Sequence, residues 1–143
     1  MPTTAQILTT MAGLIDEYGL HTGEQFAAHS YQAPLLDICA HAYLAAEGRV
    51  PAAFYTDEAA SLALIEASTG AMDAIRAIST SLDPDPTDPT PPCTTNGRPD
   101  PIEHVSNWAR TPAVFATQPP TASEVIGRIL RAADTPTIHT SAA

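Results

Sequence analysis

The first eighteen residues carry the clearest pattern of apolar and polar positions in the chain. Over residues 4–18, apolar side chains recur every three or four positions, which is the repeat of one helix face. These side chains are Ile7, Leu8, Met11, Leu14, Ile15 and Tyr18. Thr3 and Gln6 have the spacing of a capping box, and Gly19 is a typical stop. The pattern predicts an amphipathic helix over residues 4–18.

A second helix is predicted over residues 34–47, because Pro34 suits the first helical position and Gly48 the end. Its apolar stripe is broad and consists of Leu35, Leu36, Ile38, Cys39, Ala42, Tyr43 and Ala46. Broad stripes belong to helices with several neighbours, so we expect it at the centre, packed on the first helix. Residues 20–32 lack periodicity and are predicted to form a loop, with an extended piece near residues 24–27.

Two more helices are predicted before the pattern breaks. Thr56, Asp57 and Glu58 have the character of a helix start, and that helix is expected to reach about Thr69. Gly70 ends or kinks it, and a fourth helix follows over residues 71–82. Residues 83–101 contain seven prolines, which exclude a helix because proline lacks the N–H donor and clashes with the preceding turn. A proline-rich loop is expected there.

The end of the chain returns to helical patterning. A short helical segment is predicted over residues 102–108, and Thr121 with Glu124 forms a capping box that opens a last helix. Residues 134–143 are predicted to be a disordered tail. The fold class is therefore all-α, a single irregular bundle of about five helices. One domain is expected over residues 1–133, with the proline-rich loop inside it.

Composition narrows the classes of function. Of 143 residues, 44% are hydrophobic but only 6% aromatic, which favours one modest core of closely packed helices. The net charge is −10, from 16 acidic residues and 6 arginines, so the chain repels phosphate backbones and anionic membranes. We expect no nucleic-acid or membrane binding, and a basic protein would complement the charge. No apolar run reaches the ~20 residues of a membrane span, and no secretory signal precedes the domain, which predicts a cytoplasmic protein.

Three groups of polar residues are candidate functional sites. Asp37 and His41 lie four apart, the spacing of two metal ligands on one helix face, or of a surface pair. Glu103, His104 and Arg110 are candidates for an acid–base site, or for the polar face of a short helix. The aspartates of the proline-rich segment lack the spacing of a calcium-binding EF-hand. These are Asp83, Asp85, Asp88 and Asp100. No cofactor is predicted.

Cysteine and tryptophan are read as mainly structural. Cys39 lies on the apolar stripe and is expected to be a small buried core residue; two positions from His41, it diverges from that side chain by ~200°. Trp108 is expected to close the chain onto the core near Ile126 and Leu130. The functional alternative is a recognition patch of Trp108, Arg110 and His104.

Several short segments together resemble a known family. They are Tyr18-Gly19, Asp37-Ile38-Cys39-Ala40-His41-Ala42, Asn107-Trp108-Ala109-Arg110-Thr111 and Thr121-Ala122-Ser123-Glu124-Val125-Ile126. In this order, over most of residues 5–133, they resemble a family of small actinobacterial and phage proteins catalogued only as a domain of unknown function. The family has a Trp-Asn-Asp-like cluster before its last helix, whereas this chain has Ala109-Arg110 at the acidic position. The resemblance implies one α-helical domain and no particular activity.

Two classes of function remain open from the sequence. The favoured one is a non-enzymatic module that binds or regulates a protein partner. A phage or mobile-element protein acting on a basic host factor is a special case. The alternative is a small enzyme with an acid–base site around Glu103, His104 and Arg110. The oligomeric state is left open.

Overall fold

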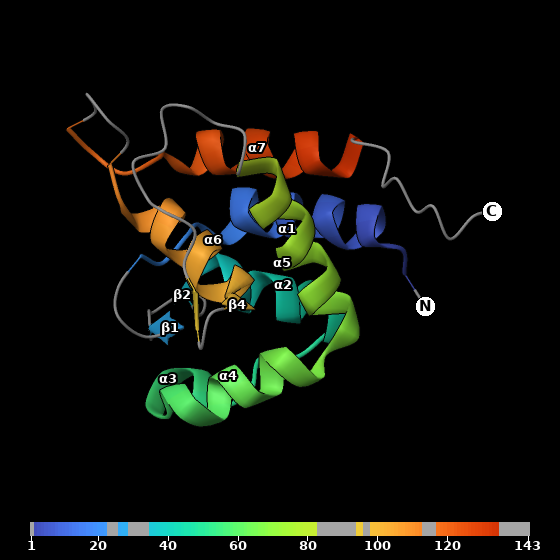
Figure 1. Ribbon diagram of the computed structural model, residues 1–143, viewed down its shortest axis with the longest axis vertical. Coiled ribbons are helices and arrows are strands. Elements are labelled where there is room, and N and C mark those ends of the chain that lie inside the picture. Colours follow the sequence, from blue (N-terminus) through green and yellow to red (C-terminus); the bar gives the residue numbers. More distant parts are fainter. Residues whose placement is uncertain are drawn as a thin grey trace.

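Seven helices and two short strand pairs make up the described part of the computed structural model, which covers residues 2–22, 26–28, 35–82, 94–95, 98–112 and 117–134 (Figure 1). The elements are α1 (Thr4–Tyr18), β1 (Ala27–Ala28), β2 (Leu35–Leu36), α2 (Ile38–Glu47), α3 (Ala53–Thr56), α4 (Glu58–Ala67), α5 (Thr69–Leu82), β3 (Thr94–Thr95), β4 (Arg98–Pro99), α6 (Pro101–Arg110) and α7 (Ala122–Asp134). The predicted all-α class is confirmed, with more helices than the five expected.

Helix α1 has the predicted bounds because both of its ends are specified locally. The amide of Gln6 donates to Thr3 Oγ1 at 3.1 Å, and the amide of Thr3 donates to Gln6 Oε1 at 2.8 Å. This reciprocal pair is the capping box, which satisfies amides that have no partner inside the helix. At the other end Gly19 has φ +86°, a backbone conformation that other residues rarely adopt.

Helix α2 begins later than predicted. Residues 35–36 form β2, which pairs antiparallel with β1, so the predicted start at Pro34 is wrong. The helix instead starts after Asp37, whose Oδ1 accepts from the amide of Ala40 at 2.7 Å. Aspartate is a strong N-cap, and the backbone of residues 35–36 is already used in strand pairing. Residues 23–25 and 29–34 lie outside the described residues, and with them half of the extended piece predicted near residues 24–27; of the other half, Ala27 lies in β1.

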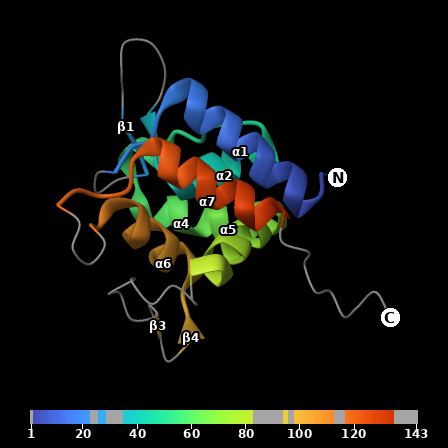
Figure 2. The ribbon, with the colours of Figure 1, turned by 90° about the horizontal axis from the view of Figure 1, so that it is seen from above.

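Helix α2 lies at the centre, as its broad stripe predicted. Helices α1, α5 and α6 pack around it, while α7 lies antiparallel to α1 on the outer side (Figures 1 and 2). The inner faces of α1 and α2 belong to one apolar core, which confirms their predicted packing. Members from these two faces include Leu8, Met11, Ile15, Ile38, Cys39 and Ala42.

The segment that contains α3, α4 and the start of α5 was predicted only in part. The four-residue α3 is fixed by buried Phe54, whose ring packs edge-on against Tyr43 at a centroid distance of 5.3 Å. Helix α4 starts after Asp57, as predicted, but stops at Ala67. The break expected at Gly70 lies at Ser68, whose hydroxyl donates to Glu47 Oε2 at 2.7 Å and accepts from the amide of Ala71.

Helix α7 follows its predicted capping residue, since the amide of Glu124 donates to Thr121 Oγ1 at 3.2 Å. Helix α6 is longer than the predicted segment 102–108 and starts at Pro101, the last residue of the stretch from which a helix was excluded, after an N-cap, Asp100, that was not predicted. Proline is tolerated there because the first helical position needs no N–H donor. The proline-rich prediction falls mainly on residues 83–93 and 96–97, and the predicted tail on residues 135–143. Both lie outside the described residues. None of the helices that the structure describes has the length and apolarity needed to cross a membrane.

Two helical glycines should respond oppositely to alanine. A Cβ at Gly70 would lie 3.0 Å from Ile7 Cδ1 and 3.2 Å from Ala46 Cβ, whereas at Gly13 it meets no atom within 4 Å. We expect Gly13→Ala to stabilise by about 0.5–1 kcal/mol through helix propensity. Gly70→Ala should instead destabilise, because overpacking costs about 1–3 kcal/mol. Urea unfolding of both variants measures the difference; a gain in both would mean that α5 shifts freely on α1 and α2.

Candidate functional site

A cleft of about 250 Å³ lies where α4, α6 and the start of α2 meet. Its lining consists of Phe26, Asp37, Glu58, Leu62, Asp100, Ile102, Glu103, Ser106 and Arg110. Four of these residues are acidic, one is an arginine and three are large and apolar. The cleft therefore combines apolar walls with an excess of negative charge.

Helical spacing explains how these side chains come together. Glu58 and Leu62 are one turn apart on α4, and Ile102, Ser106 and Arg110 follow at four-residue steps on α6. Residues four apart share a helix face, so each helix presents a continuous strip to the cleft. Asp37 and Asp100 enter as the N-caps of α2 and α6.

Asp37 links α2 to α6 at the base of this arrangement. Besides capping Ala40, it accepts a longer hydrogen bond of 3.4 Å from Ser106 Oγ to its Oδ2. Ser106 Oγ lies 3.3 Å from Cys39 Sγ, and the Cys39 thiol is 3.6 Å from the carbonyl oxygen of Ile102. The four residues form a polar chain between two helices that are otherwise joined by apolar contacts.

The surroundings change the pKa of two residues in this hydrogen-bonded group, Asp37 and Cys39. Burial raises the pKa of Asp37 to about 7. Hydrogen bonds from Ala40 and Ser106 and the positive charge of Arg110 lower this pKa, but by less than burial raises it. Burial also raises the pKa of the Cys39 thiol well above its usual value, and the nearby Asp37 charge adds to this. Cys39 is thus a protonated core residue, as predicted, and lacks the thiolate character of a nucleophile.

Arg110 is the cationic member of the cleft. Its Nε and Nη2 both donate to Asn107 Oδ1, at 3.2 and 2.7 Å, which fixes the guanidinium above α6. Arg110 also lines a much smaller hollow, next to the cleft, in which Asp37 and Ser106 meet His21. Asp37 thus lies between the two spaces.

The residues of the predicted acid–base site separate in the structure. Glu103 and Arg110 line the cleft, but His104 does not. His104 is buried, and its Nδ1 lies 2.6 Å from Ser79 Oγ on α5. Adjacent helix positions diverge by ~100°, which explains why Glu103 and His104 face different surroundings. Trp108 is partly buried against the apolar core and is not among the lining residues.

The two candidate metal ligands, Asp37 and His41, also separate, and the alternative of a surface pair fails because His41 is fully buried. His41 is fully buried, and its Nε2 donates to the carbonyl oxygen of Gly19 at 2.9 Å, while Asp37 caps α2. Burial lowers the pKa of His41, which favours the neutral ring. Its Nδ1 has no hydrogen-bond partner within the part of the chain that the structure describes. Among those same residues, no cluster of three or more metal-binding side chains occurs.

Most of the cleft could not be identified from the sequence. Glu58 and Leu62 lie on α4 and Phe26 lies just before β1, and no spacing rule relates either segment to α6. Of the acidic residues weighed for calcium, Asp100 lies at the cleft, and Asp83, Asp85 and Asp88 lie outside the described residues. The sequence pointed only to α6, because Glu103 and Arg110 were candidates for an acid–base site.

The fold and the cleft define a small all-α domain with an acidic cavity between its helices. The model of the family of unknown function DUF6197 matches residues 1–135, and the chain belongs to that family. The resemblance seen in the sequence is therefore confirmed at the level of the family. No curated protein and no solved structure matches the chain.

Stability should depend on pH through Asp37. Its pKa is raised from 3.8 to about 7, so between these values the folded state holds a proton that the unfolded state releases. The stabilisation is complete below about pH 4 and is lost as the pH rises to about 7. We expect the free energy of unfolding of the wild-type protein to fall by on the order of 2–4 kcal/mol, relative to that of Asp37→Asn, between pH 4 and pH 8.

Urea unfolding across this pH range measures the effect. Asn is as good an N-cap as Asp, so the variant keeps the helix start. The control is Asp57→Asn, the same substitution at the exposed N-cap of α4, where Asp57 Oδ1 accepts from the amide of Ala60 at 3.0 Å. A constant difference between wild type and Asp37→Asn at every pH would contradict the assignment.

Proposed function

We propose that this protein is a non-enzymatic binding module whose acidic cleft docks a basic segment of a partner protein. One observation carries the proposal: four carboxyl groups surround a cleft with apolar walls. Two of them, Glu58 and Glu103, form no ion pair or side-chain hydrogen bond with the residues that the structure describes. Their charge is therefore available to a partner.

The shape and chemistry of the cleft suit a long cationic side chain. Lysine and arginine have aliphatic stems that pack on apolar surfaces while the charged head stays near water or a counter-charge. Phe26, Leu62 and Ile102 provide the apolar surface, and the carboxyl groups the counter-charge. At about 250 Å³ the cleft accommodates an anchoring side chain and is smaller than a typical pocket for a whole small molecule.

The charge of the whole chain supports the same partner. A net charge of −10 attracts basic proteins over distances of about a Debye length and repels polyanions. A cytoplasmic regulator, in a bacterium or a phage, that binds a basic host protein is the setting we propose.

An acid–base enzyme is the second candidate, and its proton-transferring residue would be Asp37 in place of Glu103 or His104. Asp37 has a pKa of about 7 and lies at a cleft with Ser106 and Arg110, so it meets one requirement of a general base. The binding module is favoured because His104, a member of the acid–base site considered from the sequence, does not line this cleft.

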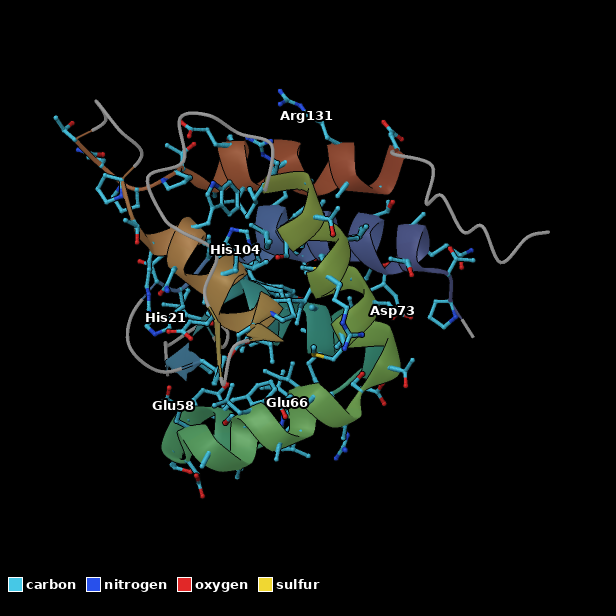
Figure 3. The ribbon with its side chains drawn as sticks, in the orientation of Figure 1. His21, Glu58, Glu66, Asp73, His104 and Arg131 are labelled. Atoms are coloured by element: carbon cyan, nitrogen blue, oxygen red, sulfur yellow. The ribbon has the colours of Figure 1, made fainter. Side chains whose placement is uncertain are left out.

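Affinity capture from the source cell, with a matched pair of variants, tests the binding module. Glu58→Gln/Glu103→Gln removes two charges at the cleft, and Glu17→Gln/Glu66→Gln removes two exposed charges elsewhere. Glu58 and Glu66 lie at different points along α4 (Figure 3), and Glu66 is not part of the cleft lining. We expect a stoichiometric basic partner with wild type and control, and recovery reduced on the order of tenfold with the cleft variant.

Equal recovery of that partner by both double variants would place the interface elsewhere. Circular dichroism establishes that each variant is folded before capture. Turnover of a metabolite by the purified protein, lost in Asp37→Asn, would favour the enzyme instead.

A further inference from the structure

We infer that Asp37 makes docking proton-linked: the cleft holds the cationic head of a partner's arginine or lysine beside ionised Asp37, and a proton leaves as that side chain binds. This inference rests on the proposed function and adds its ligand chemistry and its regulation. The proton is the one carried by the Asp37 carboxyl group in the free protein. It passes to solvent, and the incoming cation takes its place as the group that compensates the carboxylate.

The geometry leaves Asp37 able to accept a ligand. Its carboxyl group lies between the cleft and the small hollow beside His21. Oδ1 accepts one hydrogen bond from Ala40, and Oδ2 accepts one long hydrogen bond from Ser106. A carboxylate offers about four acceptor positions, so a guanidinium or ammonium group can be added without breaking the helix cap.

The cap alone does not account for a charge at this position. An N-cap needs an acceptor oxygen, and Asn or Ser supplies one without charge. Because burial raises the pKa of Asp37 to about 7, ionising it at neutral pH costs stability in the free protein. Buried groups whose ionisation is costly are concentrated at functional sites, and here the group borders a cavity.

The charged and titratable groups around Asp37 come from three helices and from the segment that follows α1. Arg110, Asp100 and Glu103 face the cleft from α6, and Glu58 faces it from α4. His21 shares the small hollow, and Cys39 follows Asp37 on α2. Arg110 is the one cation among the described lining residues, and its guanidinium is held by Asn107. The carboxyl groups of Glu58 and Glu103 alone outnumber this arginine and leave a negative potential that attracts a second cation.

That second cation acts on Asp37 as Arg110 already does. Burial is the largest influence on the pKa of the Asp37 carboxyl group and raises it, while the Arg110 charge lowers it. A cationic head placed against the free acceptor positions lowers the pKa further, and the proton is released. By linkage, the affinity for the cation rises as the pH rises through the pKa of free Asp37.

Peptide titrations into the full chain test the inference. The probes are acetylated and amidated pentapeptides with Arg or Lys between glycine pairs, and a Gln peptide as the neutral control. With a pKa of about 7, the ionised fraction of Asp37 rises about tenfold from pH 6 to pH 8. We expect the Kd of a basic peptide to fall about tenfold over that range, and calorimetry in phosphate and Tris at pH 7 to show proton release.

Two variants assign the proton. Asp37→Asn keeps the cap and should bind the basic peptide with one weaker affinity at both pH values. His21→Gln removes the neighbouring group of a type that titrates near neutrality, and should keep the tenfold dependence. Binding by Arg or Lys peptides alone reports which head group the cleft prefers, and either result supports the inference.

Three outcomes overturn the inference. They are equal affinity at pH 6 and pH 8, a pH dependence that survives in Asp37→Asn, and binding of the basic peptides no better than the Gln peptide. Each of them leaves the proposed function standing if capture of the partner still requires Glu58 and Glu103. The proposed function is contradicted by a different result, in which the cleft variant Glu58→Gln/Glu103→Gln captures the partner as well as the wild-type protein does.

Discussion

The first six residues of α2 have no face left for water, and the rest of the fold is arranged around that constraint. Six consecutive residues, Ile38 to Tyr43, are each at most 3% exposed, so α1, α5 and α6 must cover the helix from different sides. Such close approach requires small side chains, and Ala40 and Ala42 supply them. The polar residues within this stretch must find partners inside the protein, which is how Cys39 and His41 become bound to Ile102 and Gly19.

The start of α2 is where that enclosure ends, and the cleft forms there. Asp37 must cap the helix where α4 and α6 line the cleft, so a partly buried carboxyl group is placed beside a cavity. Structural and functional demands therefore meet in one residue. The cap holds the carboxyl group in position, and burial sets its protonation.

Helices with local signals were predictable, and features made by distant segments were not. The bounds of α1 follow from Thr3, Gln6 and Gly19, all of which act within one turn of the helix. The start of α2 was misjudged because the strand pairing of residues 35–36 with 27–28 outweighs the local preference of Pro34. Likewise Arg110 was a candidate from α6 alone, whereas Glu58 joins it only through tertiary packing, which no periodicity in either helix encodes.

The pairing of α1 with α7 bears on how the chain is made. The first helix to be synthesised packs most extensively on the last, and the two run antiparallel along the outside of the bundle. Val125 and Ile129, both fully buried, are contributed by α7. Because a ribosome delivers residues in order, α1 cannot pack on α7 until residues 122–134 have been synthesised. Contacts of such large sequence separation slow folding, so closing the core between α1 and α7 is expected to be a late step.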